Sequence, residues 1–342
     1  MKRKSRSSFS FRFCLPFRLS RSMFVSAATA FSIIASTAQA QPAPDYPKRP
    51  IRILVGFSAG STADLLPRIA AQRMTEVWGQ PVIVDNRPSA GGIVAAEIVA
   101  KATPDGHTLL SVSAGHAVTA ALYKSLPYDT LKDFAGITRF ANVPSILVVA
   151  PSSGIKSVKD IIALARAKPG TLTYSTPGIG SANHLAGELL KNLAVIDVTH
   201  VPFKGIPEAM TGAMTGAITF NLSPILNVVP LVNSGKLLAI ATTTGARASA
   251  LPDVPTIGES GVKGYAFDPW FGILTTAGTP RPIVNHLNQE IVRSMALPEI
   301  KARLAALGAE PAPLSPEQFD AHVRSEVEKF RKIVAAANIK VE

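Results

Sequence analysis

The stretch PIRILVGFSAGSTAD, residues 50–64, decides the class of fold. Its first part, Ile51–Val55, is a short apolar run rich in branched side chains, which is typical of a buried strand. Residues 62–77 continue with apolar side chains at helical spacing. A strand that enters a helix through a short turn of glycine and hydroxyl residues is the building unit of α/β proteins. We therefore predict an α/β fold.

The same alternation of strand and helix extends along the chain. We expect further strands at residues 82–84, 109–112, 145–149, 172–175, 218–221 and 237–241. The expected helices are residues 94–100, 158–167, 183–193, 225–233, 282–295, 298–307 and 316–337. This spacing predicts parallel sheets with helices on both faces. The last helix begins at Ser315-Pro316-Glu317-Gln318, a capping box with proline at the first helical position.

Two extended stretches, residues 134–149 and 265–275, interrupt this rhythm about one domain apart. We interpret them as the crossings between two lobes. The first lobe then comprises residues 45–142 and 268–342, and the second lobe is the continuous segment 143–267. Ligands bind in clefts between such lobes.

The first residues of the chain have the pattern of an export signal. Seven basic and no acidic side chains precede or flank an apolar run at residues 23–35, and Thr37-Ala38-Gln39-Ala40 supplies the small residues of a cleavage site. A membrane anchor needs about 20 apolar residues, and this run is shorter. We predict a signal peptide, residues 1–40, cleaved after Ala40, and therefore an exported protein.

Removal of this segment changes the charge of the chain. The net charge of the full chain is +12, and the mature part keeps 28 basic and 23 acidic residues, a net charge of +5. Without a block of Lys and Arg in the mature part, nucleic-acid binding has little support. The only cysteine, Cys14, lies in the signal segment, so the mature chain can form no disulfide and no thiolate site.

Residues 56–60 also match the G-x-S-x-G turn of α/β-hydrolases, in which Ser58 would be the nucleophile. In that fold the turn follows several strands, one of whose loops completes the oxyanion hole, whereas here it follows the first strand of the mature chain. We therefore keep a serine hydrolase as the alternative hypothesis and favour a protein that binds its ligand without catalysing a reaction.

The same loop is suited to hold a carboxylate without a cation. Backbone N–H groups at the start of a helix have no partner within the helix, and the helix dipole favours an anion there. Ser58, Ser61 and Thr62 add hydroxyl groups, and Asp64 falls in the first helical turn, where it can accept hydrogen bonds. A capped turn without a ligand is the plain structural alternative.

A second loop of this kind follows the strand at residues 172–175 and covers residues 176–184. Gly178-Ile179-Gly180 begins like a dinucleotide fingerprint, but Asn183 stands at the third glycine position, so a carboxylate or acyl group fits better. His184 is either a partner of its own loop or a ligand contact, and the sequence favours the first.

Further polar residues lie after other strands, where open α/β sheets bind ligands. Ser113 and Ala114 follow one strand and Asn221 lies at the end of another, while Lys204 is either a partner for an anion or part of a solvated or intramolecular ion pair. The spacings of metal ligands are absent from the sequence, so we expect neither a metal nor a cofactor.

At this point the sequence resembles the Bug family of periplasmic solute-binding proteins, which serve tripartite tricarboxylate transporters. The resemblance runs from Tyr46 to the C-terminus, in motifs that follow the order of the family. They are residues 46–51 (YPKRPI), the loop that ends in Asp64, 79–88 (GQPVIVDNRP), 105–110 (DGHTLL), 126–129 (LPYD), 184–188 (HLAGE), 201–205 (VPFKG), 251–256 (LPDVPT) and 277–280 (AGTP).

The resemblance implies a two-lobed, type II periplasmic-binding-protein fold with the ligand cleft between the lobes. It implies a small carboxylate ligand, held by the loops at residues 57–64, 113–115 and 176–183, and delivery by a monomer to a membrane transporter component. A sensor that serves a signalling receptor is a further alternative. The ligand residues that we predict are Phe57, Ser58, Ala59, Gly60, Ser61, Thr62, Asp64, Ser113, Ala114, Thr176, Gly178, Gly180, Ser181, Asn183, Lys204 and Asn221.

The chain departs from the family pattern at two places. Ser58, Ala59 and Ser61 replace two prolines and a glycine of the usual first loop, and Phe203 replaces a tyrosine. The first change adds hydroxyl groups and the second removes one. The identity of the carboxylate therefore does not follow from the resemblance.

Overall fold

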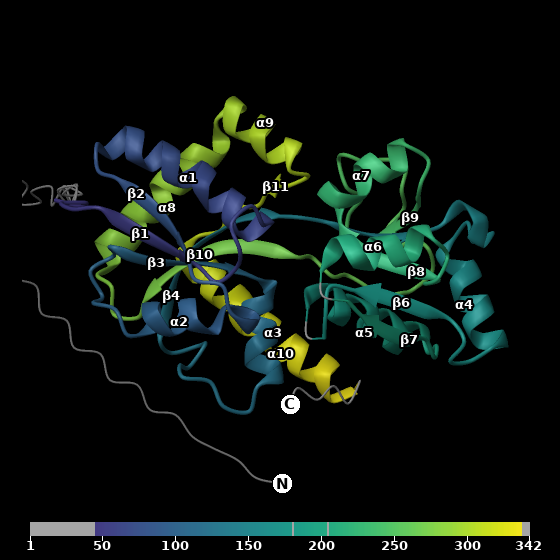
Figure 1. Cartoon of the computed structure of the whole chain (residues 1–342). Helices are drawn as coiled ribbons and strands as arrows, with labels where there is room; N and C mark the ends of the chain where they lie inside the picture. The colour runs from purple at the N-terminus through teal and green to yellow at the C-terminus, as the bar shows by residue number, and fades with distance from the viewer. Residues whose placement is uncertain (1–44, 180, 204, 337–342) are drawn as a thin grey trace, which may run out of the picture. The chain divides into compact units, whose positions relative to one another are not determined.

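The computed structural model describes residues 45–179, 181–203 and 205–336 (Figure 1). The predicted signal peptide, residues 1–40, lies outside the described residues, as do the predicted ligand residues Gly180 and Lys204. The described chain folds into two α/β lobes, each built around one sheet. The predicted fold class is thereby confirmed.

The sheet of the first lobe has the strand order β11-β4-β10-β3-β1-β2. Its strands are β1 (Ile51–Val55), β2 (Val82–Asn86), β3 (Thr108–Ser113), β4 (Phe134–Asn142), β10 (Trp270–Thr276) and β11 (Glu310–Pro311). β1 pairs in parallel with both β2 and β3. β10 runs antiparallel to β3 and β4, and β11 runs antiparallel to β4.

The sheet of the second lobe has the order β7-β6-β8-β5-β9. Its strands are β5 (Ser145–Val149), β6 (Thr173–Thr176), β7 (Thr199–Pro202), β8 (Phe220–Pro224) and β9 (Leu238–Thr242). β6 pairs in parallel with β7 and β8, whereas β5 is antiparallel to β8 and β9.

The prediction of parallel sheets is therefore correct for β1–β3 and β6–β8 and wrong for the strands beside the crossings. Parallel neighbours need a crossover of a dozen or more residues, usually a helix. The chain instead passes from Asn142 at the end of β4 to Ser145 at the start of β5, with no helix between them. It returns through β10, and the Val143 amide donates to the Pro269 carbonyl at 2.8 Å, which ties the two crossings together. The residue limits of the lobes stay a prediction.

Helices cover both faces of the first sheet. α1 (Thr62–Trp78), α8 (Arg281–Ala296) and α9 (Pro298–Ala306) lie on one side, and α2 (Ile93–Ala100), α3 (Ala114–Leu122) and α10 (Pro316–Ala336) on the other. Successive strand residues face opposite layers: Ile53 packs in the core with Leu66 of α1, while Leu54 packs in the core with Val99 of α2.

The second sheet is covered in the same way. α4 (Val158–Ala167) and α5 (Ala182–Ala194) share one core with Leu147 of β5, and α6 (Ile206–Met214) and α7 (Ile225–Asn233) share the other core with Ile146. The predicted helix at residues 225–233 has the observed bounds, whereas α3 and α6 were not predicted. β8 begins and ends later than the predicted strand at residues 218–221.

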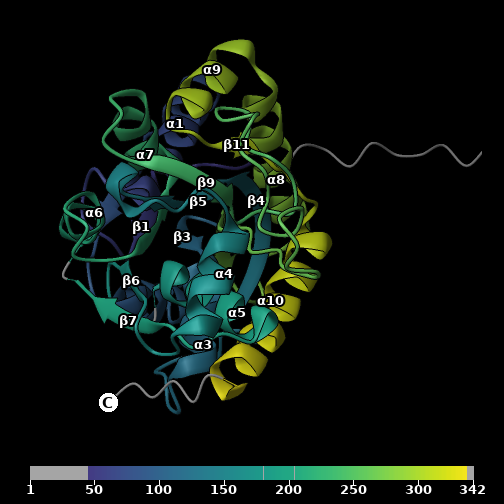
Figure 2. The same ribbon diagram turned by 90° about the vertical axis from the view of Figure 1, so that its right-hand side faces the viewer.

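The C-terminal helix α10 lies beside α3 and β4 and also contacts α5 of the second lobe (Figures 1 and 2). The predicted capping box begins it. The Ser315 amide donates to Gln318 Oε1 at 3.0 Å, and the Gln318 amide donates to Ser315 Oγ at 3.2 Å. Figure 2, which views the second lobe end-on, shows α10 running past both α3 and α5.

Candidate functional site

Three helices begin at one edge of the first sheet. Because β1, β2 and β3 are parallel, their carboxyl ends lie at the same edge. The helices α1, α2 and α3 follow these strands in turn, and their N-terminal ends carry N–H groups without intrahelical partners. The edge therefore presents the positive ends of three helix dipoles, a suitable environment for an anion.

The loop between β1 and α1 is fastened by Asp64, which is 1 % exposed. Its carboxylate accepts hydrogen bonds from the Gly60 amide at 2.8 Å, from Asn86 Nδ2 at 2.9 Å and from Arg68 Nε at 2.9 Å. Burial alone would raise the pKa of Asp64, but these hydrogen bonds and the charge of Arg68 outweigh it and lower the pKa below its usual 3.8. Asn86 also donates to the Phe57 carbonyl at 3.0 Å, so one pair of side chains holds both ends of the loop.

The side chains of this loop differ in exposure. Ser58, Ala59 and Gly60 are exposed, whereas Phe57, Ser61 and Thr62 are partly buried. Ser61 is the N-cap of α1, yet its hydroxyl caps no backbone amide and is a buried oxygen without a hydrogen-bond partner in the described chain. Ser58, the nucleophile of the hydrolase alternative, makes no hydrogen bond to a histidine among the described residues.

The start of α2 completes this edge, and it was not among the predicted site residues. Gly91 and Gly92 have φ angles of 62° and 72°, in the left-handed region that favours glycine. A Cβ on Gly56 would lie 2.4 Å from the Cα of Gly92, so the β1 loop and the α2 start meet backbone to backbone. The signal in the sequence was the pair of glycines directly before an apolar helix.

The third helix start is built from two predicted residues. Ser113 is the last residue of β3 and the N-cap of α3, and its Oγ accepts a hydrogen bond from the Gly115 amide at 3.2 Å. Ala114 is buried. A small cavity of about 10 Å³ is lined by Phe57, Gly92 and Ser113 together, so the structure brings the three loops of this edge into contact with one space.

In the second lobe α5, α6 and α7 follow the parallel strands β6, β7 and β8. Ser181 caps α5: its Oγ accepts from the His184 amide at 3.2 Å and donates to the Gly178 carbonyl at 2.8 Å. Asn183 is buried, and its Nδ2 donates to the Leu222 carbonyl at 2.9 Å and to Ser145 Oγ at 3.2 Å. The loop is thus tied to the centre of its own sheet.

A buried polar cluster lies behind this loop. Thr176 Oγ1 is 2.6 Å from His200 Nε2, and the His200 ring stacks on the His184 ring with 4.0 Å between centroids. Burial lowers the pKa of both histidines to about 4. The Tyr174 hydroxyl donates to Glu188 Oε1 at 2.6 Å in the same cluster. The His184 ring thus packs against another strand of its own lobe, and its role toward its loop or a ligand stays a prediction.

The placement predicted for Asn221 was wrong. Asn221 does not lie at the end of its strand but is the second residue of β8, fully buried, and its Nδ2 donates to the carbonyl and hydroxyl oxygens of Ser175 at 3.1 and 3.0 Å. The hydrophobic pattern ends at these polar residues, yet Asn221 and Ser223 are both buried inside the strand, and Asn221 Oδ1 and Ser223 Oγ have no hydrogen-bond partner among the described residues. Asn221 therefore stitches β8 to β6.

No group of acidic, histidine or cysteine side chains suited to a metal ion is present among residues 45–179, 181–203 and 205–336. Within the same ranges no helix is long and apolar enough to cross a membrane.

A family model described as "Tripartite tricarboxylate transporter family receptor" matches residues 66–339. The chain belongs to this family. Protein BugT of Bordetella pertussis is a relative that is 31 % identical over 314 residues, which cover 91 % of this chain and 96 % of BugT. The resemblance to the Bug family is thereby confirmed.

Solved structures of the family share this fold. Rpa4515 of R. palustris with adipate is 34 % identical, with a TM-score of 0.77 over 86 % of this chain and 99 % of that one. MatC (Rpa3494) of Rhodopseudomonas palustris with bound malate is 30 % identical, with a TM-score of 0.71 over 84 % and 100 % of the two chains. The chain thus belongs to a family of periplasmic solute-binding proteins, of which BugD, 30 % identical to it, is another solved member.

Proposed function

We propose that this family member binds a small carboxylate in the cleft between its lobes and delivers it, as a monomer, to the membrane component of a tripartite tricarboxylate transporter. The observation that carries this proposal is the pair of edges at which helices start: α1, α2 and α3 in the first lobe, α5, α6 and α7 in the second. N-terminal helix ends bind carboxylates with backbone N–H groups and need no cation.

Two related structures support the class of ligand. Their ligands, adipate and malate, are both dicarboxylates. In the present chain Ser61 carries a buried hydroxyl that has no hydrogen-bond partner among the described residues, beside the start of α1, and we assign it as a donor to the ligand. Because such a ligand would contact both lobes, it would favour the closed arrangement, which a membrane partner can recognise.

The ligand can be identified without prior choice. Protein exported to the periplasm is purified, its copurified small molecules are identified by mass spectrometry, and solute-free protein is then titrated calorimetrically with that molecule and with adipate, malate, a tricarboxylate and an aromatic acid. We expect saturable binding of at least one carboxylate. Binding of none of them by folded, solute-free protein would refute the proposal.

A serine substitution tests the site itself. Ser61→Ala should weaken the binding of the carboxylate about two- to tenfold, which is the contribution of one hydrogen bond. The stability of the protein should stay unchanged, because the Ser61 hydroxyl makes no hydrogen bond within the described chain. Ser234→Ala, at an exposed serine that only bonds the Leu231 carbonyl, is the control. Equal affinities of the two variants would remove Ser61 from the site.

Delivery needs a separate measurement. Cells that lack the protein should lose uptake of the identified carboxylate, and ligand-loaded protein should capture the transporter's membrane subunit from detergent extracts better than ligand-free protein does. If the protein captured a signalling receptor instead and uptake were unchanged in cells that lack it, the transport proposal would be wrong and a role as a sensor would take its place.

A further inference from the structure

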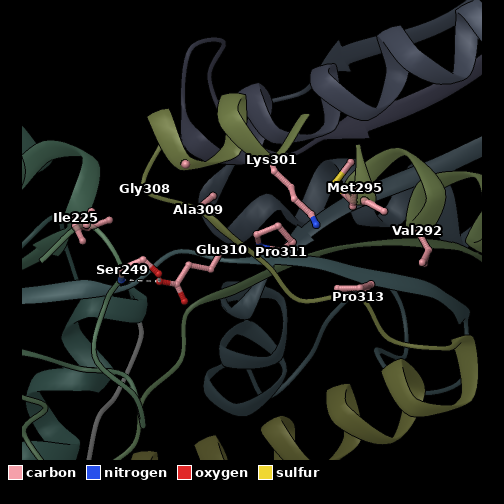
Figure 3. A pocket seen from close by; sticks show the side chains of 13 residues that line it. Ile225, Ser249, Val292, Met295, Lys301, Gly308, Ala309, Glu310, Pro311 and Pro313 are labelled. Atoms are coloured by element: carbon pink, nitrogen blue, oxygen red, sulfur yellow. Dashed lines mark hydrogen bonds between the residues drawn. The ribbon is translucent and has the colours of Figure 1, made fainter. Parts of the chain in front are cut away.

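An apolar pocket of about 690 Å³ lies where the two lobes meet (Figure 3). Its walls come from α8, α9 and residues 308–313 in the first lobe and from Ile225 and Ser249 in the second. None of the described residues predicted to bind the carboxylate lines it. Its volume falls in the range of about 300–1,000 Å³ that is usual for small-molecule sites.

The pocket exists because small side chains stand where larger ones would fill the space. Ala296 ends α8, Ala305 lies on α9, and Ala309 follows α9, while Met295 supplies a long and adaptable apolar side chain to the wall. The lining is mainly apolar. A molecule that enters would therefore bury an alkyl or aromatic body against these residues.

Contacts between the lobes define one side of the pocket. The amide and the hydroxyl of Ser249 both donate to Glu310 Oε1, at 2.9 and 2.7 Å, as Figure 3 shows. Gly308, with a φ of 62°, lies so close to Ile225 that a Cβ there would be 2.3 Å from Ile225 Cγ2. The two lobes thus meet closely at this wall.

The pocket has one acidic and one basic lining residue, and only the acidic one has a hydrogen-bonded partner among the described residues. Glu310 is the acidic lining residue, and one of its oxygens already accepts two hydrogen bonds from Ser249. Lys301 is the basic lining residue; its side chain reaches from α9 toward Pro311, and it has no ion pair with a described acidic residue (Figure 3). A negative group beside Lys301 would supply the missing partner.

We propose that this pocket is a second ligand site, for an amphipathic anion whose apolar body packs against Met295 and the alanines and whose acidic group lies beside Lys301. It is separate from the carboxylate cleft. Because its walls come from both lobes, an occupant contacts both.

Two fluorescent probes with the same ring system test the proposal: anilinonaphthalene sulfonate, which is an anion, and N-phenyl-naphthylamine, which is uncharged. Both should bind the exported protein saturably. Ala305→Trp fills the pocket and should weaken the binding of both probes at least tenfold. Ala302→Trp, at an exposed position of the same helix that does not line the pocket, should leave both unchanged. Equal binding by the two tryptophan variants would overturn the proposal.

Lys301→Gln tests the charge. It should weaken the sulfonate about two- to fivefold, as expected for an ion pair at a solvent-exposed rim, and leave the uncharged probe unchanged. An equal effect on both probes, or on neither, would contradict the assignment of an anion. Thermal unfolding checks that each variant folds. If Ala305→Trp does not fold, Ala296→Leu, which fills less of the pocket, replaces it. Binding of the copurified carboxylate should persist in all variants, which separates this site from the cleft.

Discussion

Gly56 and Gly92 meet so closely that a Cβ on Gly56 would lie 2.4 Å from the Cα of Gly92. This contact joins the loop after β1 to the start of α2, and a backbone neighbour cannot move aside as the end of a side chain can. Gly56→Ala should therefore destabilise the protein by about 1–3 kcal/mol, the usual cost of overpacking, and weaken the binding of the ligand. Urea unfolding and calorimetry measure the two effects. Gly245→Ala, whose Cβ would have 3.6 Å to its nearest neighbour, is the control, and equal stabilities of the two variants would contradict the argument.

Asp64 should be the residue that keeps the first loop in place. Asp64→Asn keeps the shape of the side chain but removes the charge that Arg68 and the Gly60 amide address. We expect a loss of about 2 kcal/mol in the free energy of unfolding, since hydrogen bonds to charged groups are worth about 1.5–3 kcal/mol. Denaturant unfolding at neutral pH measures this loss. A variant as stable as the wild type would show that the carboxylate does not hold the loop.

The same substitution should change the acid sensitivity. The pKa of Asp64 in the folded protein lies below its usual 3.8, so its contribution to stability is complete above pH 3.8 and is lost as the pH falls from 3.8 through the folded value. The wild type should lose stability below that pH more steeply than Asp64→Asn does. Urea midpoints of both proteins are measured from about pH 2.5 to about pH 5, a range that extends about 1.3 units to either side of the usual aspartate pKa, and they give the slope of stability against pH for each protein. Parallel curves would contradict the prediction.

The fold followed from the sequence wherever a hydrophobic period was strong, as in α1, α7 and α10. α3 was missed because Ser113 ends β3 and caps α3 at once, which leaves no loop to mark the boundary, and because alanine and glycine give its first turn little hydrophobic contrast. β8 was misplaced because Asn221 and Ser223 are fully buried polar residues within it.

The positions of the candidate loops could also be predicted from the sequence. The contacts that stabilise these loops could not. Hydroxyl and glycine residues after a strand are a local signal, and helix capping by Ser113 and Ser181 agrees with it. The support comes from residues far away in the chain: Asn86 for Asp64, Gly92 for Gly56, and His200 for Thr176. No local pattern encodes such pairs, because only the sheet order brings them together.

The histidine pair of the second lobe should make the protein less stable in mild acid. Burial lowers the pKa of His184 and His200 to about 4 from 6.5, with the charge of Lys191 acting in the same direction and Glu188 opposing it at His200. The unfolded chain therefore takes up protons first, and stability falls as the pH decreases from 6.5 toward 4. His116 and His322, whose pKa burial also lowers to about 4, add to this fall.

A single substitution separates the share of one histidine. The glutamine of His200→Gln cannot be protonated, so the urea midpoint of this variant should fall less than that of the wild type when the pH decreases from about 7 to about 4. This expectation holds whatever the stability of the variant is at neutral pH. Thr176→Val removes the hydroxyl beside His200 without removing the titrating group, and it should keep the steeper wild-type slope. Identical slopes for His200→Gln and the wild type would show that His200 does not titrate with folding.

The capping box of α10 gives the most local prediction. Ser315→Ala removes the acceptor of the Gln318 amide, and loss of an N-cap side chain costs about 1 kcal/mol. The loss should appear in the global unfolding transition, because α10 packs on α3 and β4 and shares a core with both sheets. Ser325→Ala is the matched control on the same helix, since that hydroxyl only bonds the His322 carbonyl of its own helix, and its removal should change stability little. If both variants lost the same stability, the cap would contribute nothing of its own, and the helix would be held by its packing alone.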